Sequence, residues 1–180
     1  MTISVDPITQ EIVGNKLESI VREMTVTVMR TARSSVIHSG KDFSCAIADA
    51  NGQLLAIGTS LPIHTFPMIS QVRRLIEKFN DDILPGDVFV GNDPFEGGTH
   101  LPDVIVALPF FDGGELRNFT LARAHWLDAG GMSPGGMSGS VREIFQEGIR
   151  LPIVKLYNEG KLNQSAWDIL FHNVRTPLEN

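Results

Sequence analysis

Cysteine is almost absent from this sequence, which has one, Cys45, among 180 residues. A single cysteine excludes any disulfide within the chain. Cys45 lies in the alternating apolar stretch "DFSCAIAD", which indicates a buried and unreactive thiol. We therefore expect a reducing, cytoplasmic compartment.

Basic stripes, long apolar runs and nucleotide-binding loops are also missing. The net charge of -6 and the pI near 5.3 argue against nucleic acid as a partner. No stretch approaches the roughly 18 apolar residues of a membrane span, and "MTISVDPITQEIVGN" is not a signal peptide, so no membrane association is expected. Neither G-x-x-x-x-G-K-[ST] nor G-x-G-x-x-G occurs, so any ATP used in the reaction is expected on another chain.

Hydrophobic residues make up 42% of the chain and follow both helical and strand periodicity. Helical spacing after Asp6-Pro7 predicts a helix to about Arg33. Two apolar runs around Asn51-Gly52, and two more around the turn at 112–115, predict β-hairpins. The other predicted elements are a helix over 66–79, a short strand after Pro85-Gly86, a glycine- and serine-rich loop over 129–140 and a helix over 163–174.

Two hairpins require antiparallel pairing. We therefore predict an α+β fold, with a mixed, mainly antiparallel sheet, hairpins and flanking helices.

Four polar residues stand where predicted strands meet loops, namely Asp42, His100, Asp103 and His125. If the strands pair, loops at one edge of the sheet bring these side chains together. Pro102 restricts the backbone between His100 and Asp103, so a tight bend lets the two side chains converge. Two imidazoles with one or two carboxylates suit Mn, Zn or Fe(II), and such a site can polarise a carbonyl or activate water.

A structural interpretation of the same four residues stays open. An aspartate before a strand is usually a turn residue, and a histidine at a strand end is usually satisfied by its surroundings. The spacing H-x-x-D is far less specific than a paired C-x-x-C pattern. Spacing alone therefore does not decide between a metal site and ordinary turn residues.

The other histidines have their own interpretations. His38 lies four residues before Asp42 and could reach the same site, although a structural role is about equally expected. His64 could line a pocket, but it is more readily explained as a residue at the entry of a helix. His172 lies among apolar residues of the last predicted helix, where we expect a structural role.

Two further aspartates and a glycine pair lie near the candidate site. Asp93, before Pro94, is a good turn residue, and its nearness to His100 also makes it a candidate for orienting the metal-binding side chains; Asp128, three residues after His125, is a similar candidate. Gly97 and Gly98 are expected to leave space for a ligand to approach the backbone.

Gly131 to Gly135 match the G-x-S-x-G pattern of a serine nucleophile elbow. Pro134 follows the serine and has no N–H to offer an oxyanion hole, and the segment is too rich in glycine and proline to start a helix. We therefore exclude a serine nucleophile. The loop is instead expected to be a mobile flap over the strand ends, with Met132 and Met137 as adaptable contacts.

Several stretches of the sequence resemble the hydantoinase B/oxoprolinase family. They are "DPITQEIVGNKLESIVREM", "GKDFSCAIADANGQLLA", "GDVFVGNDPFEGGTHLPDV", "RAHWLDAGG" and "EIFQEGIRLPIVKL", and together they span most of the chain. Members of this family are several times longer than a minimal domain. The resemblance therefore implies that residues 1–180 are the N-terminal segment of a larger hydantoinase B-type fold, truncated relative to the family.

The resemblance also implies an activity, a partner and a ligand set. Such proteins form hetero-oligomers with a hydantoinase A-like ATP-binding subunit and hydrolyse cyclic amides such as hydantoins, 5-oxoproline or lactams. In the related acetone carboxylases two histidines and an aspartate hold manganese, and these ligands correspond to His100, Asp103 and His125, with Asp42 as a fourth. The neighbourhood of this site suggests His38 or Asp42 as a catalytic proton carrier.

Two other functions remain open. The chain could belong to an ATP-dependent ketone carboxylase, of the kind that acts on acetone or acetophenone, because the family contains both reactions. It could also be a non-catalytic assembly module that docks the ATP-binding subunit through the apolar face of its first helix, around Ile20 and Met24. An apolar stripe of this kind is more often part of the core of its own chain.

Overall fold

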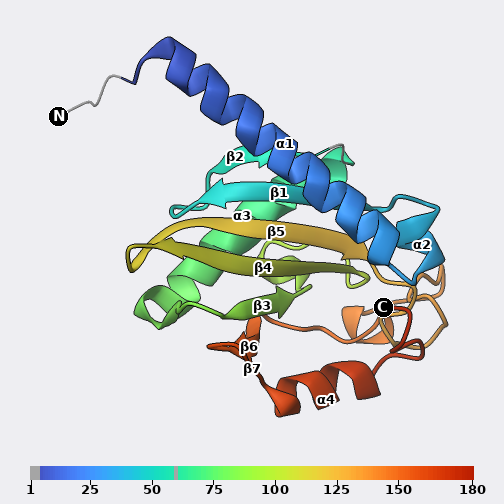
Figure 1. The fold of residues 1–180 in the computed structure, drawn as a ribbon. Helices are drawn as coiled ribbons and strands as arrows, with labels where there is room; N and C mark the ends of the chain where they lie inside the picture. The colour runs from blue at the N-terminus through green and yellow to red at the C-terminus, as the bar shows by residue number, and fades with distance from the viewer. Residues whose placement is uncertain (1–4, 59–60) are drawn as a thin grey trace.

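A computed structural model describes residues 5–58 and 61–180, which fold around one seven-stranded sheet (Figure 1). The strand order is β2-β1-β5-β4-β3-β6-β7, and each neighbouring pair among the described residues is antiparallel. The strands are β1 Phe43–Asp49, β2 Leu54–Ile57, β3 Val88–Gly91, β4 Asp103–Asp112, β5 Glu115–His125, β6 Val154–Asn158 and β7 Lys161–Leu162. The α-helices are α1 Pro7–Thr31, α2 Ser35–His38, α3 Pro62–Phe79 and α4 Gln164–His172. The predicted α+β class, with a mainly antiparallel sheet and flanking helices, is confirmed.

Helix α1 starts where the sequence predicts and ends two residues early. The side chain of Asp6 accepts a hydrogen bond from the Thr9 N–H at 3.0 Å, and Pro7 occupies the first turn, where its missing N–H costs nothing. Ala32 is extended, which ends the helix at Thr31 rather than near Arg33. The N-terminal part of α1 projects beyond the sheet (Figure 1), and Ile8 there is 68% exposed.

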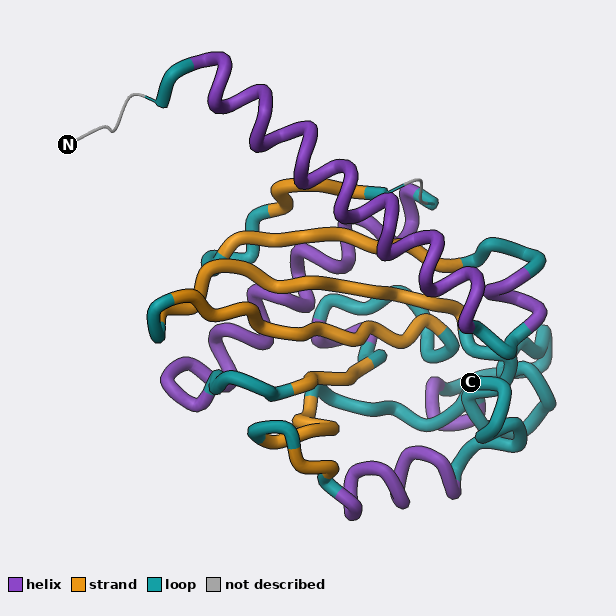
Figure 2. The backbone as a smooth tube through the Cα atoms, viewed as in Figure 1, coloured by secondary structure: helices purple, strands orange, loops and turns teal. Residues whose placement is uncertain are grey.

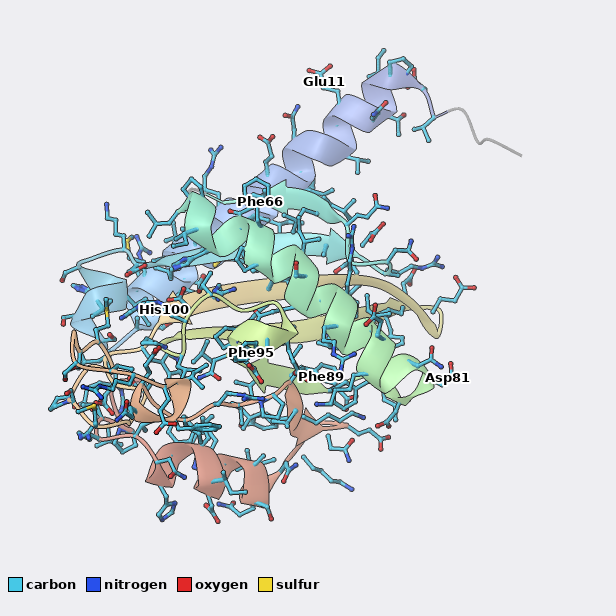
Figure 3. The ribbon with its side chains drawn as sticks, turned by 180° about the vertical axis from the view of Figure 1, so that it is seen from behind. Glu11, Phe66, Asp81, Phe89, Phe95 and His100 are labelled. Carbon is cyan, nitrogen blue, oxygen red and sulfur yellow. The ribbon has the colours of Figure 1, made fainter. Side chains whose placement is uncertain are left out.

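Strand β1 forms the core with both of its faces, because side chains alternate across a strand. Ala46 and Ala48 belong to the core cluster that contains Met68 of α3, while Cys45 belongs to the cluster that contains Val21 of α1. Helices α1 and α3 therefore cover opposite faces of the sheet, as Figures 1 and 3 show from the two sides. The buried Cys45 fits the predicted unreactive thiol, since burial raises its pKa to about 11.

One end of the sheet collects the polar residues that the sequence singled out. Strands β1 and β4 begin there and β5 ends there, because β5 runs antiparallel to both neighbours. The loops of the chain also gather at this end, close to the C-terminus (Figure 2). In the pairing of β4 with β5, Asp103 lies directly opposite His125.

Among the described strands and α-helices, the sequence patterns did not predict the β6–β7 hairpin and the short helix α2. Strand β7 has two residues, and the turn between the strands places Glu159 and Gly160 at positive φ. Helix α2 has four residues. None of the described helices is both long enough and apolar enough to cross a membrane.

Candidate metal centre

Three predicted ligands come together at the loop end of the sheet. Asp103 begins β4 and His125 ends β5, and their register makes them cross-strand neighbours on one face. His100 lies one tight turn before Asp103, and the Asp103 N–H donates to the His100 carbonyl at 3.0 Å. The bend predicted around Pro102 is therefore present, and it turns the His100 ring back toward β4.

The donor atoms of these residues form a small triangle. Asp103 Oδ1 lies 2.7 Å from His100 Nε2 and 3.2 Å from His125 Nδ1, and the two nitrogens are 3.2 Å apart. Donor atoms that share one ion at bonds of about 2 Å are separated by roughly 3 Å. The triangle therefore has the donor types and spacings of a two-histidine, one-carboxylate metal site.

Asp103 is suited to bind a cation because it stays ionised. The residue is 1% exposed, and burial alone raises the pKa of a carboxyl. Hydrogen bonds with His100, His125 and Thr99 stabilise the carboxylate more strongly, so the pKa of Asp103 lies well below its ordinary value. This side chain therefore carries a full negative charge at neutral pH.

A buried arginine lies beneath Asp103. Arg123 is 0% exposed, and its Nε lies 3.7 Å from Asp103 Oδ2. It donates from Nη2 to Thr99 Oγ1 at 2.6 Å and from Nη1 to Gln71 Oε1 at 3.0 Å. Burial lowers the pKa of Arg123 to about 10, against the opposing effect of the Asp103 charge, so the guanidinium stays protonated at neutral pH.

His64 and Asp42 extend the cluster toward β1. His64 Nε2 lies 3.4 Å from Asp42 Oδ1 and 3.6 Å from Asp103 Oδ2, and its Nδ1 lies 3.1 Å from Ser44 Oγ. Burial lowers the pKa of His64, and the negative charge of Asp103 counteracts this in part. His64 does lie in the first turn of α3, as expected, but it also lies between two carboxylates of the candidate site.

Asp42 stands at the edge of the triangle rather than within it. Its Oδ2 lies 4.0 Å from His125 Nδ1, and its side chain is 34% exposed. The Asp42 carbonyl also accepts a hydrogen bond from the His125 N–H at 3.0 Å, which ties the start of β1 to the end of β5. This position suits Asp42 better for exchanging protons with the site than for binding the metal as a fourth ligand.

Two other histidines make local contacts. His38 Nδ1 lies 2.9 Å from the neighbouring Ser39 Oγ, and the His38 ring makes no hydrogen bond or ion pair with the triangle among the described residues. His172 Nδ1 lies 2.8 Å from the carbonyl oxygen of Asp168, within helix α4. The structure thus places His38 outside the cluster and agrees with a structural role for His172.

Asp93 and Asp128 hold loops in place. Asp93 accepts hydrogen bonds from the Phe95 N–H and from Arg150 Nε, so it does not orient the triangle directly as the sequence suggested. Asp128 accepts from the N–H groups of Gly130, Gly135 and Arg175 and from the Arg175 guanidinium. It therefore joins the glycine-rich loop to the C-terminal segment.

The expectation that Gly97 and Gly98 leave space for a ligand is wrong. A Cβ at Gly97, where φ is +93°, would lie 2.7 Å from Ser70 Cβ, and one at Gly98 would lie 2.7 Å from the Asn92 carbonyl oxygen. The space is filled by helix α3 and by the chain's own backbone. These glycines are required by close packing, which sequence alone does not distinguish from room for a ligand.

A cavity of about 410 Å³ lies beside the triangle, within the usual range for small-molecule sites. It is lined by His100, Pro102, Gly136, Met137, Ser138, Gly139, Val141 and Glu147. Residues 136–139 of the glycine-rich loop thus lie beside His100, with Met137 among the lining residues, whereas Met132 does not line this cavity; the mobility of the loop stays a prediction. No helix follows Ser133 and Pro134 before Ile144 in the described chain, in agreement with the exclusion of a nucleophile elbow.

The fold and the cluster together define an α+β sheet domain with a candidate His-Asp-His metal centre at one sheet end. The model of the hydantoinase B/oxoprolinase family matches residues 6–180, and the chain belongs to this family.

The relatives and solved structures that the chain resembles include three informative proteins. The beta subunit of the caprolactamase of Pseudomonas jessenii is 37% identical over 172 residues, and the caprolactamase crystal structure superimposes with a TM-score of 0.88 over 96% of this chain. The B component of a putative D-/L-hydantoinase of Pseudomonas sp. (strain NS671) is 37% identical over 179 residues, or 96% of this chain. A nucleotide-free acetone carboxylase structure is 25% identical and superimposes with a TM-score of 0.89. The match covers 97% of this chain and 23% of the acetone carboxylase chain. The chain spans 30% of the length of each of the first two proteins.

Proposed function

We propose that this chain carries the metal-binding catalytic site of an ATP-dependent cyclic amide hydrolase of the hydantoinase, 5-oxoprolinase or lactamase type. The observation that carries the proposal is the triangle of His100, Asp103 and His125 donor atoms in a chain of the hydantoinase B family. The proposed cofactor is a divalent cation, Mn, Zn or Fe. The proposed partner is a hydantoinase A-like protein that uses ATP, since two relatives are named as the beta or B component of their enzymes.

The residues of the triangle would hold the cation, and their chemistry fits it. Asp103 provides a permanently ionised oxygen, and the two imidazole nitrogens that face each other supply the borderline donors preferred by Mn, Zn and Fe(II). A bound divalent cation supplies Lewis-acid polarisation of an amide or phosphoryl oxygen. His100 also lines the adjacent cavity, so a substrate there would lie against the triangle.

Asp42 is the proposed proton carrier. In the proposed reaction the ATP-binding partner transfers the γ-phosphoryl group of ATP to the amide oxygen and releases ADP. Water then attacks the activated carbon and gives up a proton, and the ring C–N bond breaks with the nitrogen leaving as the protonated amine. A second water hydrolyses the resulting acyl phosphate to the carboxylate and phosphate. Asp42 is positioned to accept the proton of the first water because its carboxylate is partly exposed and lies 4.0 Å from His125 Nδ1. His64, at 3.4 Å from the same carboxylate, holds it in place. The geometry favours Asp42 over His38, whose ring contacts Ser39.

We expect Asp42→Asn to lower kcat by roughly 100-fold, the usual contribution of a general base, while the bound metal content stays unchanged. Asn keeps the size of the side chain and removes its proton affinity. The matched variant His38→Gln should change kcat by less than about threefold, as expected of a residue that does not transfer the proton. Steady-state kinetics and metal analysis of the two purified variants test which residue carries the proton. A larger loss of kcat in His38→Gln than in Asp42→Asn would identify His38 as the proton carrier.

A second candidate function is ATP-dependent carboxylation of a ketone. The similarity to acetone carboxylase favours it, because that structure superimposes with a TM-score of 0.89 over 97% of this chain. In that reaction the triangle would orient bicarbonate or CO2 instead of water. The hydrolase is preferred because the relatives at 37% identity carry amide-hydrolase names.

The test of function is an assay of the complete protein with its ATP-binding partner. Hydantoin, 5-oxoproline and caprolactam are supplied with ATP and Mn²⁺, and ring opening is followed together with ADP release. The proposal predicts ring opening of at least one of these that requires both ATP and metal. Incorporation of labelled bicarbonate into acetone or acetophenone, without ring opening, would establish the carboxylase instead.

A further inference from the structure

We propose that Thr99 and Arg123 are positioning residues that hold the Asp103 carboxylate with one oxygen turned to the cation and the other fixed in the protein. This inference rests on the proposed metal site. It explains a set of buried polar contacts that the triangle itself does not require.

The two oxygens of Asp103 have different surroundings. Oδ1 faces His100 Nε2 at 2.7 Å and His125 Nδ1 at 3.2 Å, so it points into the triangle. Oδ2 accepts a hydrogen bond from the Thr99 hydroxyl and lies 3.7 Å from Arg123 Nε. The carboxylate is therefore arranged to offer a cation a single oxygen, Oδ1.

Arg123 fixes the Thr99 hydroxyl in turn. Its Nη2 donates to Thr99 Oγ1 at 2.6 Å, so the Thr99 oxygen accepts from Arg123 and donates its own proton to Asp103. Nη1 donates to Gln71 Oε1 at 3.0 Å, which anchors the guanidinium to helix α3. A chain of hydrogen bonds thus runs from α3 through β5 to the metal-facing carboxylate.

The position of Arg123 is costly for stability, which favours a role in the site. Phe119 and Leu121 precede it on the same face of β5, and both belong to the hydrophobic core. An apolar side chain would continue this series, and replacing a buried ion pair by apolar groups is often neutral or stabilising. The guanidinium also leaves Nε without a hydrogen-bond partner among the described residues.

The charge of Arg123 also has a consequence for the ligand set. Asp103 and Arg123, both less than 2% exposed, form a neutral pair under the two imidazoles. Outer partners of a metal ligand that orient it and tune its charge typically change metal affinity 10–100-fold when they are removed. Thr99 and Arg123 should therefore affect metal binding without touching the metal.

The test is a titration of the complete, metal-free protein with Mn²⁺, followed by the electron paramagnetic resonance signal of the free ion. Thr99→Val, which keeps the shape and removes the hydroxyl, should raise the Kd for Mn²⁺ by about 10–100-fold. Thr99→Ser, which loses a methyl group and keeps the hydroxyl, should bind Mn²⁺ within about threefold of the unaltered protein. A role in shape alone would give the opposite order, because valine fills the space better than serine.

Two further variants complete the experiment. Thr120→Val, on the opposite face of β5, is the matched control and should leave the Kd unchanged. Arg123→Lys keeps the charge, but lysine cannot reach Thr99 and Gln71 together, so this variant should also weaken Mn²⁺ binding. If Thr99→Val does not fold, the Kd of Arg123→Lys for Mn²⁺ tests the inference instead. Unaltered affinity in folded Thr99→Val or Arg123→Lys overturns this inference alone. Absence of Mn²⁺ binding in the unaltered protein overturns the metal site and the inference together.

Discussion

Asp103→Asn is expected to remove the bound metal and to lower turnover of the complete enzyme by about 1,000-fold or more. Oδ1 of Asp103 is the atom shared by both histidine contacts of the triangle. Asparagine has nearly the same shape but no charge, so the buried Arg123 would lose its counter-ion and the pocket would become positive. A bound cation supplies several kcal/mol of transition-state stabilisation, and about 4 kcal/mol corresponds to a factor of 1,000 in rate.

The control for this prediction is Asp93→Asn. Asp93 is also buried and lies at the start of the segment that leads to Asp103, but its oxygens accept from the Phe95 N–H and from Arg150 Nε. This variant should retain its metal even if it lowers the stability of the fold. Metal analysis and kcat are measured on both proteins. Full metal content in Asp103→Asn, or equal loss in both variants, would contradict the assignment of Asp103 as a ligand.

Asp128→Ala is expected to lower the free energy of unfolding by roughly 3 kcal/mol, because buried donors are left without an acceptor. Asp128 is 2% exposed and accepts from three backbone N–H groups and from Arg175. These contacts lower its pKa below the ordinary value of 3.8, although burial opposes the shift. The stabilisation is therefore present above that ordinary pKa and is lost as the pH falls through the folded-state pKa.

Urea denaturation at neutral and acidic pH measures this effect. Asp81→Ala is the matched control, since Asp81 lies exposed in the turn after α3 (Figure 3) and should change the free energy of unfolding by less than about 0.5 kcal/mol. The difference between Asp128→Ala and the unaltered protein should shrink as the pH is lowered below 3.8. Equal stability of the two aspartate variants at pH 7 would mean that the loop is held by other contacts.

Local signals predicted most of the elements of the fold. Asn51-Gly52 and the glycine pair at 113–114 supply the backbone freedom that tight hairpin turns need, and Gly52, Gly113 and Gly114 all have positive φ. Asp6 with Pro7 marks the start of α1. The β6–β7 hairpin was missed because β7 has two residues, too few for an alternating pattern, and because most of β6 is only half-buried.

The sequence alone predicted only part of the candidate site, because some of its contacts depend on local turns and others on how distant elements pack. His100 and Asp103 are close in sequence, so a turn suffices to join them, whereas the pairing of Asp103 with His125 depends on strand register. Arg123, Gln71 and His64 come from β5 and α3 and were not assigned to the site. The arginine within the apolar alternation of "NFTLARAH" was the available signal, since an arginine on a buried strand face requires a partner.

The central claim is that His100, Asp103 and His125 hold one divalent cation, and anomalous X-ray scattering tests it most directly. Crystals of the complete protein are grown with Mn²⁺, and data are collected on both sides of the manganese absorption edge. The account predicts one anomalous peak within bonding distance, about 2 Å, of His100 Nε2, Asp103 Oδ1 and His125 Nδ1. A peak bound elsewhere, or an empty triangle in crystals of the active, metal-supplied enzyme, would contradict it.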